Sequence, residues 1–325
     1  MLPVKILEGE AQMKNMLLTI LRLITLFIVY LVLFIVSSRV NNPPELQSMF
    51  TPEQLNQAAI ALPIVSLIMS LMLSYLALRS RWHGWKLAGA LFLIFYVLYT
   101  FLGWVELLAF PAVSDQMPKG FLTPGMLIEG LMLGSLVLGI PFSLLAVWIL
   151  DKTKKESVED GPNDRLRMST FEWIWKLASA AILYVLVYFT FGYFVAWRTP
   201  GLPQFYGGTD PGTFLGQLAN VMRGTPWLYA LQIGRGLIWA GIGCIIIRMH
   251  KGKSWEVIVA TGMSFTVLMN ASLLFPNPFF PPFVAHAHMI ELVSSNFLYG
   301  ILLSVLMLWT PIKQMRTIRT AHPTD

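Results

Sequence analysis

The stretch MLLTILRLITLFIVYLVLFIVSS, residues 16–38, decides the fold class of this chain. Arg22 is its only charged residue, and most of the others are leucine, isoleucine, valine and phenylalanine. A helix needs about 20 apolar residues to cross the roughly 30 Å hydrocarbon core of a bilayer. Residues 16–38 are therefore predicted to form a transmembrane helix.

The composition of the whole chain supports the same class. Of its 325 residues, 56% are hydrophobic and 12% are charged, whereas soluble domains carry about 25% charged residues. The single cysteine, Cys244, excludes a framework of disulfides within the chain. The sequence predicts an integral membrane protein.

Seven further stretches have the length and apolar character of a span. They cover residues 57–78, 85–109, 125–150, 171–196, 226–248, 255–275 and 287–310. Each is predicted to be a helix, because backbone groups in lipid must be hydrogen-bonded within their own segment and the sequence lacks the alternating pattern of a barrel. The expected fold is all-α, with eight transmembrane helices arranged as four consecutive helical hairpins.

A charged connection divides the chain into two halves. The segment DKTKKESVEDGPNDRLRMST, residues 151–170, is predicted to be a cytoplasmic linker between membrane halves 1–150 and 171–325. WKLAGA at 85–90 and WKLASA at 175–180 open two spans in the same orientation. This similarity suggests that the hairpins are internal repeats, as in some transporters. The alternative is that Trp-Lys is a common way to begin a span.

Lysine and arginine residues are concentrated in alternate connections. The richer set holds Lys5, Lys14, Arg79, Arg81, Lys86, Lys152, Lys154, Lys155, Arg165, Arg167, Arg248, Lys251, Lys253, Lys313, Arg316 and Arg319, and the other holds Arg39, Lys119, Arg198 and Arg223. By the positive-inside rule the richer set is cytoplasmic, and so are both termini. The expected location is the plasma membrane of a prokaryote. The net charge of +6 then reflects topology, and nucleic acid is not an expected partner.

Eight polar or ionisable residues lie inside the predicted spans at similar depth. They are Glu106, Glu129, Gln232, Arg235, Asn270, His288, Glu291 and Asn296. A charge inside a bilayer costs at least about 2.5–3.5 kcal/mol, so such groups are expected to face the bundle interior and to meet a partner or water. At a rise of about 1.5 Å per residue, all of them lie in the outer leaflet or near the midplane. We therefore predict one ligand-binding pocket that opens to the extracytoplasmic side.

Arg235 requires a carboxylate partner, because a guanidinium remains protonated anywhere in a protein. Glu129 is the first candidate, since EG at 129–130 and RG at 235–236 occupy equivalent helix positions. Small residues beside both would let the two helices approach closely. Glu106 is the second candidate. The alternative to a functional pair is an ion pair that only specifies helix packing.

His288 and Glu291 are three residues apart and so share one helix face. With Glu106 and Glu129 they would form a set of one imidazole and three carboxylates suited to Fe, Mn or Zn. The alternatives are a proton or solute site, or ordinary chemistry of a membrane interface. Haem is not expected, because the histidines outside residues 286–288 all fall in predicted cytoplasmic segments. No cofactor is firmly implied.

Three classes of function remain open at this point. The leading one is binding or translocation of a small solute or of protons, because transporters place such groups near the midplane and histidine titrates near neutral pH. The others are a membrane-embedded metal-dependent enzyme and a non-catalytic subunit of a larger, respiratory-type membrane complex. Common hydrolase, zinc-protease and nucleotide-binding motifs do not occur in the sequence, so an enzyme is not the leading interpretation. The expected partners are the lipid bilayer and other membrane proteins or further copies of the chain.

One outer connection contains an amphipathic stretch, residues 214–222, after several turn-forming glycines and prolines. Such a stretch can form a helix that lies along the membrane surface. The alternative is a plain ordered loop.

Overall fold

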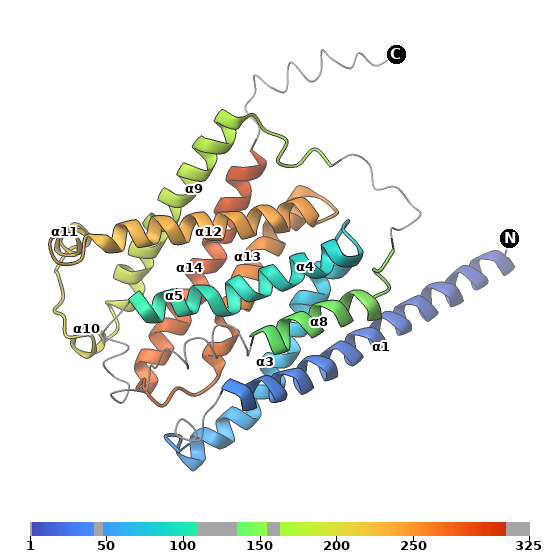
Figure 1. Ribbon diagram of the computed structural model, residues 1–325, viewed down its shortest axis with the longest axis horizontal. Helices are drawn as coiled ribbons and strands as arrows, with labels where there is room; N and C mark the ends of the chain where they lie inside the picture. Colours follow the sequence, from blue (N-terminus) through green and yellow to red (C-terminus); the bar gives the residue numbers. More distant parts are fainter. Residues whose placement is uncertain (1, 42–47, 110–134, 155–162, 310–325) are drawn as a thin grey trace.

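The computed structural model describes residues 2–41, 48–109, 135–154 and 163–309. Within these ranges the chain is helical and has no β-strand; an isolated bridge joins Ser80 and His250. Seven of the helices are long and apolar enough to cross a membrane. The architecture is that of a polytopic helical membrane protein (Figure 1).

The helices follow one another along the chain with short connections. They are α1 (Leu2–Asn41), α3 (Pro52–Leu78), α4 (Gly84–Phe95), the π-helix η1 (Tyr96–Phe101), α5 (Leu102–Ala109), α8 (Ser135–Ile149), α9 (Thr170–Phe191), the π-helix η3 (Gly192–Ala196), α10 (Leu202–Phe205), α11 (Phe214–Gly224), α12 (Trp227–Met249), α13 (Ser254–Asn270), the 3-10 helix η4 (Ala271–Leu274) and α14 (Pro282–Leu308). Seven predicted spans coincide with these long helices. The predicted span 125–150 lies partly outside the described residues, and its described part is the short apolar helix α8.

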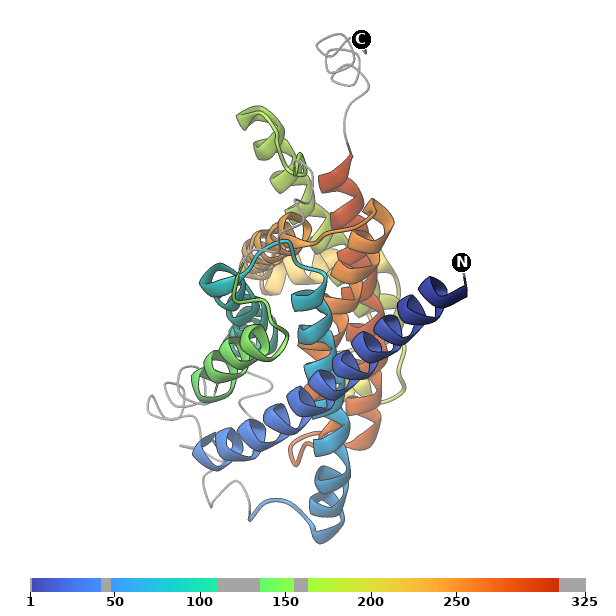
Figure 2. The same cartoon turned by 90° about the vertical axis from the view of Figure 1, so that its right-hand side faces the viewer.

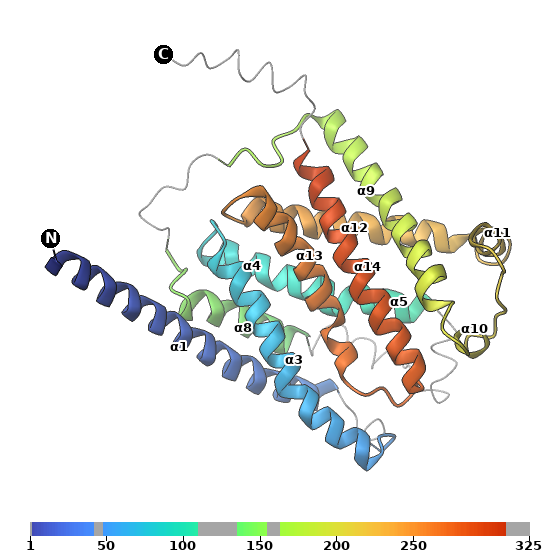
Figure 3. The ribbon, with the colours of Figure 1, turned by 180° about the vertical axis from the view of Figure 1, so that it is seen from behind.

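Two sets of helices cross within the molecule. Figure 1 shows α12, α4 with α5, and α8 running in similar directions, and Figure 3 shows α9, α14, α13 and α3 crossing them from behind. The helix α1 packs against α3 and α8, and Figure 2 shows it running obliquely along the side of the molecule. The most extensive contacts join α13 to α14 and α12 to α9. These two pairs surround the polar residues of the second half of the chain.

Side chains complete the hydrogen bonding at several helix ends. The Thr51 hydroxyl accepts from the backbone of Gln54, and the Gln54 side chain accepts from the backbone of Thr51, which fixes the start of α3. The buried Lys176 of α9 donates to the carbonyls of Met307 (3.1 Å) and Trp309 (2.6 Å). Lys176 therefore satisfies carbonyls that a helix leaves unpaired and ties the start of α9 to the end of α14.

The described connections that were predicted to be cytoplasmic meet at one end of the helices. The backbone of residues 79–81 is hydrogen-bonded to residues 249–251, with N···O distances of 2.8 and 2.6 Å. Gly84 N donates to Lys152 O at 2.7 Å. The arginine-rich connections thus form one cluster, although their side of the membrane remains a prediction.

His250 lies in this cluster, directly after α12, and is fully buried. Its Nε2 is 3.4 Å from the Tyr75 hydroxyl, and its Nδ1 has no hydrogen-bond partner among the residues that the structure describes. Its carbonyl accepts from Arg165. Burial, followed by the positive charge of Arg79, lowers the pKa of His250 from 6.5 to about 4. The imidazole is therefore neutral in the folded protein near neutral pH.

We expect the free energy of unfolding to fall as the pH is lowered from 6.5 towards 4, because His250 takes up a proton in this window when unfolded but not when folded. In His250→Gln this contribution should be absent, so that unfolding of the variant depends less on pH. Chemical unfolding of both proteins in detergent across this window measures the difference. The same comparison with the exposed His286→Gln should show no change, and an equally steep pH dependence in His250→Gln would contradict the expectation.

Candidate functional site

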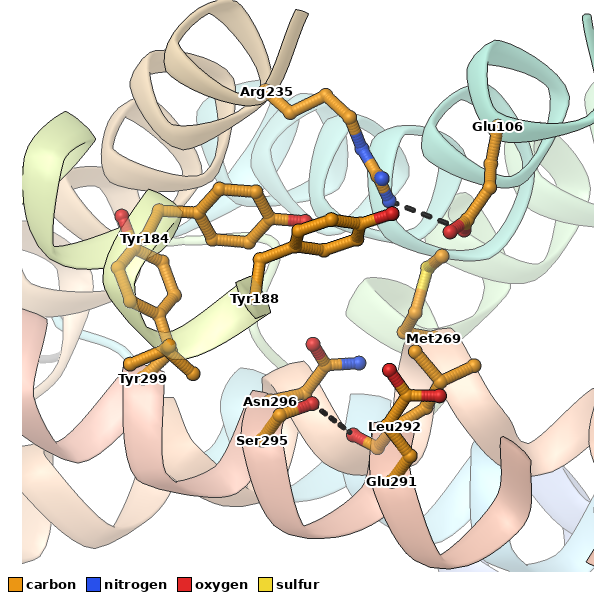
Figure 4. A pocket seen from close by; sticks show the side chains of 11 residues that line it. Glu106, Tyr184, Tyr188, Arg235, Met269, Glu291, Leu292, Ser295, Asn296 and Tyr299 are labelled. Atoms are coloured by element: carbon orange, nitrogen blue, oxygen red, sulfur yellow. Dashed lines mark hydrogen bonds and ion pairs between the residues drawn. The ribbon is translucent and has the colours of Figure 1, made fainter. Parts of the chain in front are cut away.

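Four of the predicted site residues line one cavity inside the bundle (Figure 4). They are Glu106 of α5, Arg235 of α12, and Glu291 and Asn296 of α14. The other lining residues are Tyr184, Val187, Tyr188, Met269, Leu292, Ser295 and Tyr299. The cavity has a volume of about 20 Å³, which is enough for about one water molecule.

Arg235 is the best-buried charge of the cavity, with 3% of its surface exposed. Its guanidinium donates to Glu106 Oε2 (3.2 Å) and to Gln232 Oε1 (3.2 Å), and lies 5.8 Å from the centre of the Tyr184 ring. The Arg235 Nε and Gln232 Nε2 atoms are buried without a partner in the described part of the chain. The partner of Arg235 is thus Glu106, the second candidate from the sequence. Glu129, the first candidate, lies outside the described residues.

The π-helix η1 helps to aim Glu106 at Arg235. Leu102 N bonds back to the carbonyl of Val97, five residues earlier, instead of the usual four. One surplus residue rotates all later side chains by about 100° relative to an uninterrupted α-helix. Glu106 follows four residues after this turn, so its direction depends on it. π-turns often occur at functional sites.

A chain of hydrogen bonds leads from Glu291 towards the outer connections. His288 Nδ1 lies 3.2 Å from Glu291 Oε2, as the spacing of three residues predicts, and His288 Nε2 lies 2.7 Å from the Tyr206 hydroxyl. Tyr206 follows α10, in the connection between α9 and α12. Burial, followed by the negative charge of Glu291, raises the pKa of Tyr206, so the phenol keeps its proton. The phenol can therefore donate to Nε2 while Nδ1–H donates to Glu291.

The two asparagines among the predicted site residues join α13 to α14. Asn296 Nδ2 donates to Asn270 Oδ1 (3.3 Å), and Asn270 Nδ2 donates to the carbonyl of Leu292 (3.2 Å). Asn296 also lines the cavity, whereas Asn270 and Gln232 do not. These two residues position the neighbours of the cavity instead.

The predicted metal set of His288, Glu291, Glu129 and Glu106 is only partly described. His288 and Glu291 are in contact, but among the described residues no group of three His, Cys, Asp or Glu side chains is arranged to hold a metal ion. Glu106 instead pairs with Arg235.

Three tyrosines of the site were not singled out from the sequence. Tyr184 and Tyr188 are four residues apart on α9, a spacing that places both on one face of the helix, and both face the cavity. That spacing was readable, but aromatic residues at this spacing are ordinary in helix packing. Tyr206 gave no signal, because its contact with His288 depends on the path of a loop.

An aromatic layer closes the cavity on the side towards the cytoplasmic cluster. The rings of Trp239 and Phe265 are 4.5 Å apart, and those of Tyr184 and Tyr299 are 5.0 Å apart. All four side chains are buried, as is Leu303 one turn further along α14. Polar groups thus connect the cavity to the Tyr206 end of the bundle, and apolar packing separates it from the other end.

These features define a class: a helical membrane protein with a buried ion pair and a water-sized polar cavity. No protein-family model, no curated protein and no solved structure matches the chain. The chemistry of the cavity is therefore the basis for assigning a function.

Proposed function

We propose that this protein takes up protons from the extracytoplasmic side of a prokaryotic plasma membrane and binds them at the cavity between Glu106 and Glu291, as a step of proton or coupled solute translocation. The observation that carries the proposal is the chain Tyr206–His288–Glu291, which ends at a cavity holding a second carboxylate and Arg235. Every member of this chain can accept and release a proton.

The size of the cavity favours the proton over a larger substrate. A volume of about 20 Å³ leaves room for one water molecule but not for a sugar, an amino acid or a drug-sized molecule. A water molecule there would meet carboxylates and hydroxyl groups, which is the environment that proton relays in membrane proteins use. A solute would require the helices to separate.

The hydrogen-bond directions permit a balanced transfer. A proton from outer water adds to the Tyr206 oxygen while the Tyr206 O–H proton passes to His288 Nε2. The imidazolium then releases its Nδ1 proton to the Glu291 carboxylate. Glu291 becomes neutral, and Tyr206 keeps one proton. His288 ends as the neutral Nε2–H tautomer, and reorientation of its proton resets the chain.

Proton flux into liposomes tests this function directly. The purified chain is reconstituted with an internal pH dye, and a potassium gradient with valinomycin compensates the charge. In Glu291→Gln the flux should fall by about 100-fold or more, the range typical of a positioned proton-transfer group. His288→Gln should show a similar loss, since it interrupts the chain before Glu291.

His286→Gln is the matched control, because His286 lies two residues from His288 on the same helix but is exposed. It should conduct like the parent. A Glu291→Gln variant that folds and conducts like the parent would refute the proposal. Flux in the parent that appears only when a small solute is added would identify solute coupling as the function.

The metal-dependent enzyme and the complex subunit are not favoured by a specific observation. A metal site at His288 and Glu291 would need a third ligand, and the described His, Cys, Asp and Glu residues do not supply one. Much of α1 is exposed and apolar, a surface that suits lipid as well as a partner.

A further inference from the structure

The outer connection between α9 and α12 contains a helix, α11, with an unusual exposed surface. Leu215 is 74% exposed and Met222 is 56% exposed. These residues are seven apart, so they lie on the same side of the helix. Asn220 and Arg223 are also exposed but point to a different side, since they are rotated from Met222 by about 160° and 100°. The helix therefore presents one apolar and one polar exposed face.

The third side of α11 is fastened to the protein. Phe214 stacks on Phe194 of η3 with ring centres 5.6 Å apart, and Gln217 is buried. The Tyr229 hydroxyl of α12 donates to the carbonyl of Leu218 at 2.9 Å. The orientation of α11 is thus set by contacts with η3 and α12, and the apolar face is left uncovered by the described residues of the protein.

The orientation of α11 matches the plane of a membrane. Figures 1 and 3 show α11 end-on while α12, one of the long apolar helices, runs across the view, so the two are close to perpendicular. Trp227, 46% exposed, begins α12 three residues after α11 ends. Tryptophan is enriched where a span leaves the hydrocarbon region.

From this arrangement we infer that α11 lies in the outer leaflet of the bilayer, with Leu215 and Met222 buried at the boundary between headgroups and acyl chains and with Asn220 and Arg223 in water. An amphipathic helix perpendicular to a span and level with its terminal tryptophan meets the geometric requirement for such a position. The leaflet covers the apolar face and holds the connection that carries Tyr206 at a fixed depth. This inference is independent of proton uptake.

Site-directed fluorescence in vesicles tests it. Because Cys244 is the single cysteine, Cys244→Ala gives a background for labelling one position at a time. A fluorophore on Leu215→Cys or Met222→Cys should be quenched several-fold more by spin-labelled lipids than by aqueous iodide. On the control positions Asn220→Cys and Arg223→Cys the order should reverse.

Other outcomes would overturn the inference. Quenching of all four positions by iodide alone would place α11 in water, and protection of Leu215→Cys and Met222→Cys from both quenchers would mean that protein covers the face. Hydroxyl-radical footprinting of the native chain in vesicles needs no substitution and should leave Met222 unoxidised. Oxidation of Met222 there would likewise contradict a position in the leaflet.

Discussion

Arg235→Ala is expected to lower the free energy of unfolding by about 2–4 kcal/mol, because it leaves the Glu106 carboxylate inside the bundle without its partner. The loss should fall below that of a fully buried pair, since 29% of the Glu106 side chain is exposed and water can reach it. Arg235→Ala also removes the donor to Gln232. Unfolding of parent and variant in mixed micelles, titrated with a denaturing detergent, measures the change.

Arg223→Ala is the matched control for this experiment, because Arg223 is an exposed arginine at the end of α11 and should change stability by less than about 0.5 kcal/mol. Arg235→Met combined with Glu106→Gln should recover part of the loss, since no unpaired charge remains. A single Arg235→Ala variant as stable as the parent would show that the ion pair contributes nothing in the membrane.

Gly300→Ile should have an effect at least as large, because α13 and α14 cross at this residue without any intervening side chain. A Cβ atom on Gly300 would lie 2.7 Å from Gly262 Cα and 3.0 Å from Gly262 N. Overpacking against side chains costs about 1–3 kcal/mol, and here the obstacle is backbone, which cannot rotate away. We expect a loss of about 3 kcal/mol or more, together with a broken Asn296–Asn270 hydrogen bond.

Gly241→Ile separates packing from helix propensity. Gly241 lies on α12 with open space where its side chain would be. The same substitution there should leave stability unchanged or raise it by about 0.5 kcal/mol, because isoleucine favours a helix more than glycine does. If detergent unfolding gave equal values for the Gly300→Ile and Gly241→Ile variants, the close crossing of α13 and α14 would be wrong.

The helices were predictable from the sequence because a bilayer imposes a simple requirement on length and polarity. Residues 16–38 and six other stretches met it, and the structure has long apolar helices there. Arg235 could be identified as a residue that needs a carboxylate by the same reasoning. The choice of partner could not be made in this way, because the direction of Glu106 depends on the π-turn at 96–101. No periodicity rule anticipates where such a turn forms.

The relay from the outer side was only half visible in the sequence. His288 and Glu291 are neighbours on one helix, so their contact follows from spacing alone. Tyr206 is 82 residues away from His288 in the chain, and its position results from the fold of the connection between α9 and α12. Long-range contacts of this kind depend on tertiary packing, for which a single sequence contains no direct pattern.

The aromatic layer beneath the cavity has an electrical consequence. Water and polar groups reach Glu291 from the Tyr206 end, whereas Trp239, Phe265 and Leu303 fill the space beyond. In such a membrane most of the voltage drop falls across the dry layer, where moving one elementary charge is worth about 2.3 kcal/mol per 100 mV. Charging of Glu291 from outside would then respond weakly to voltage, and passage of a charge beyond Trp239 would carry nearly all of the voltage dependence.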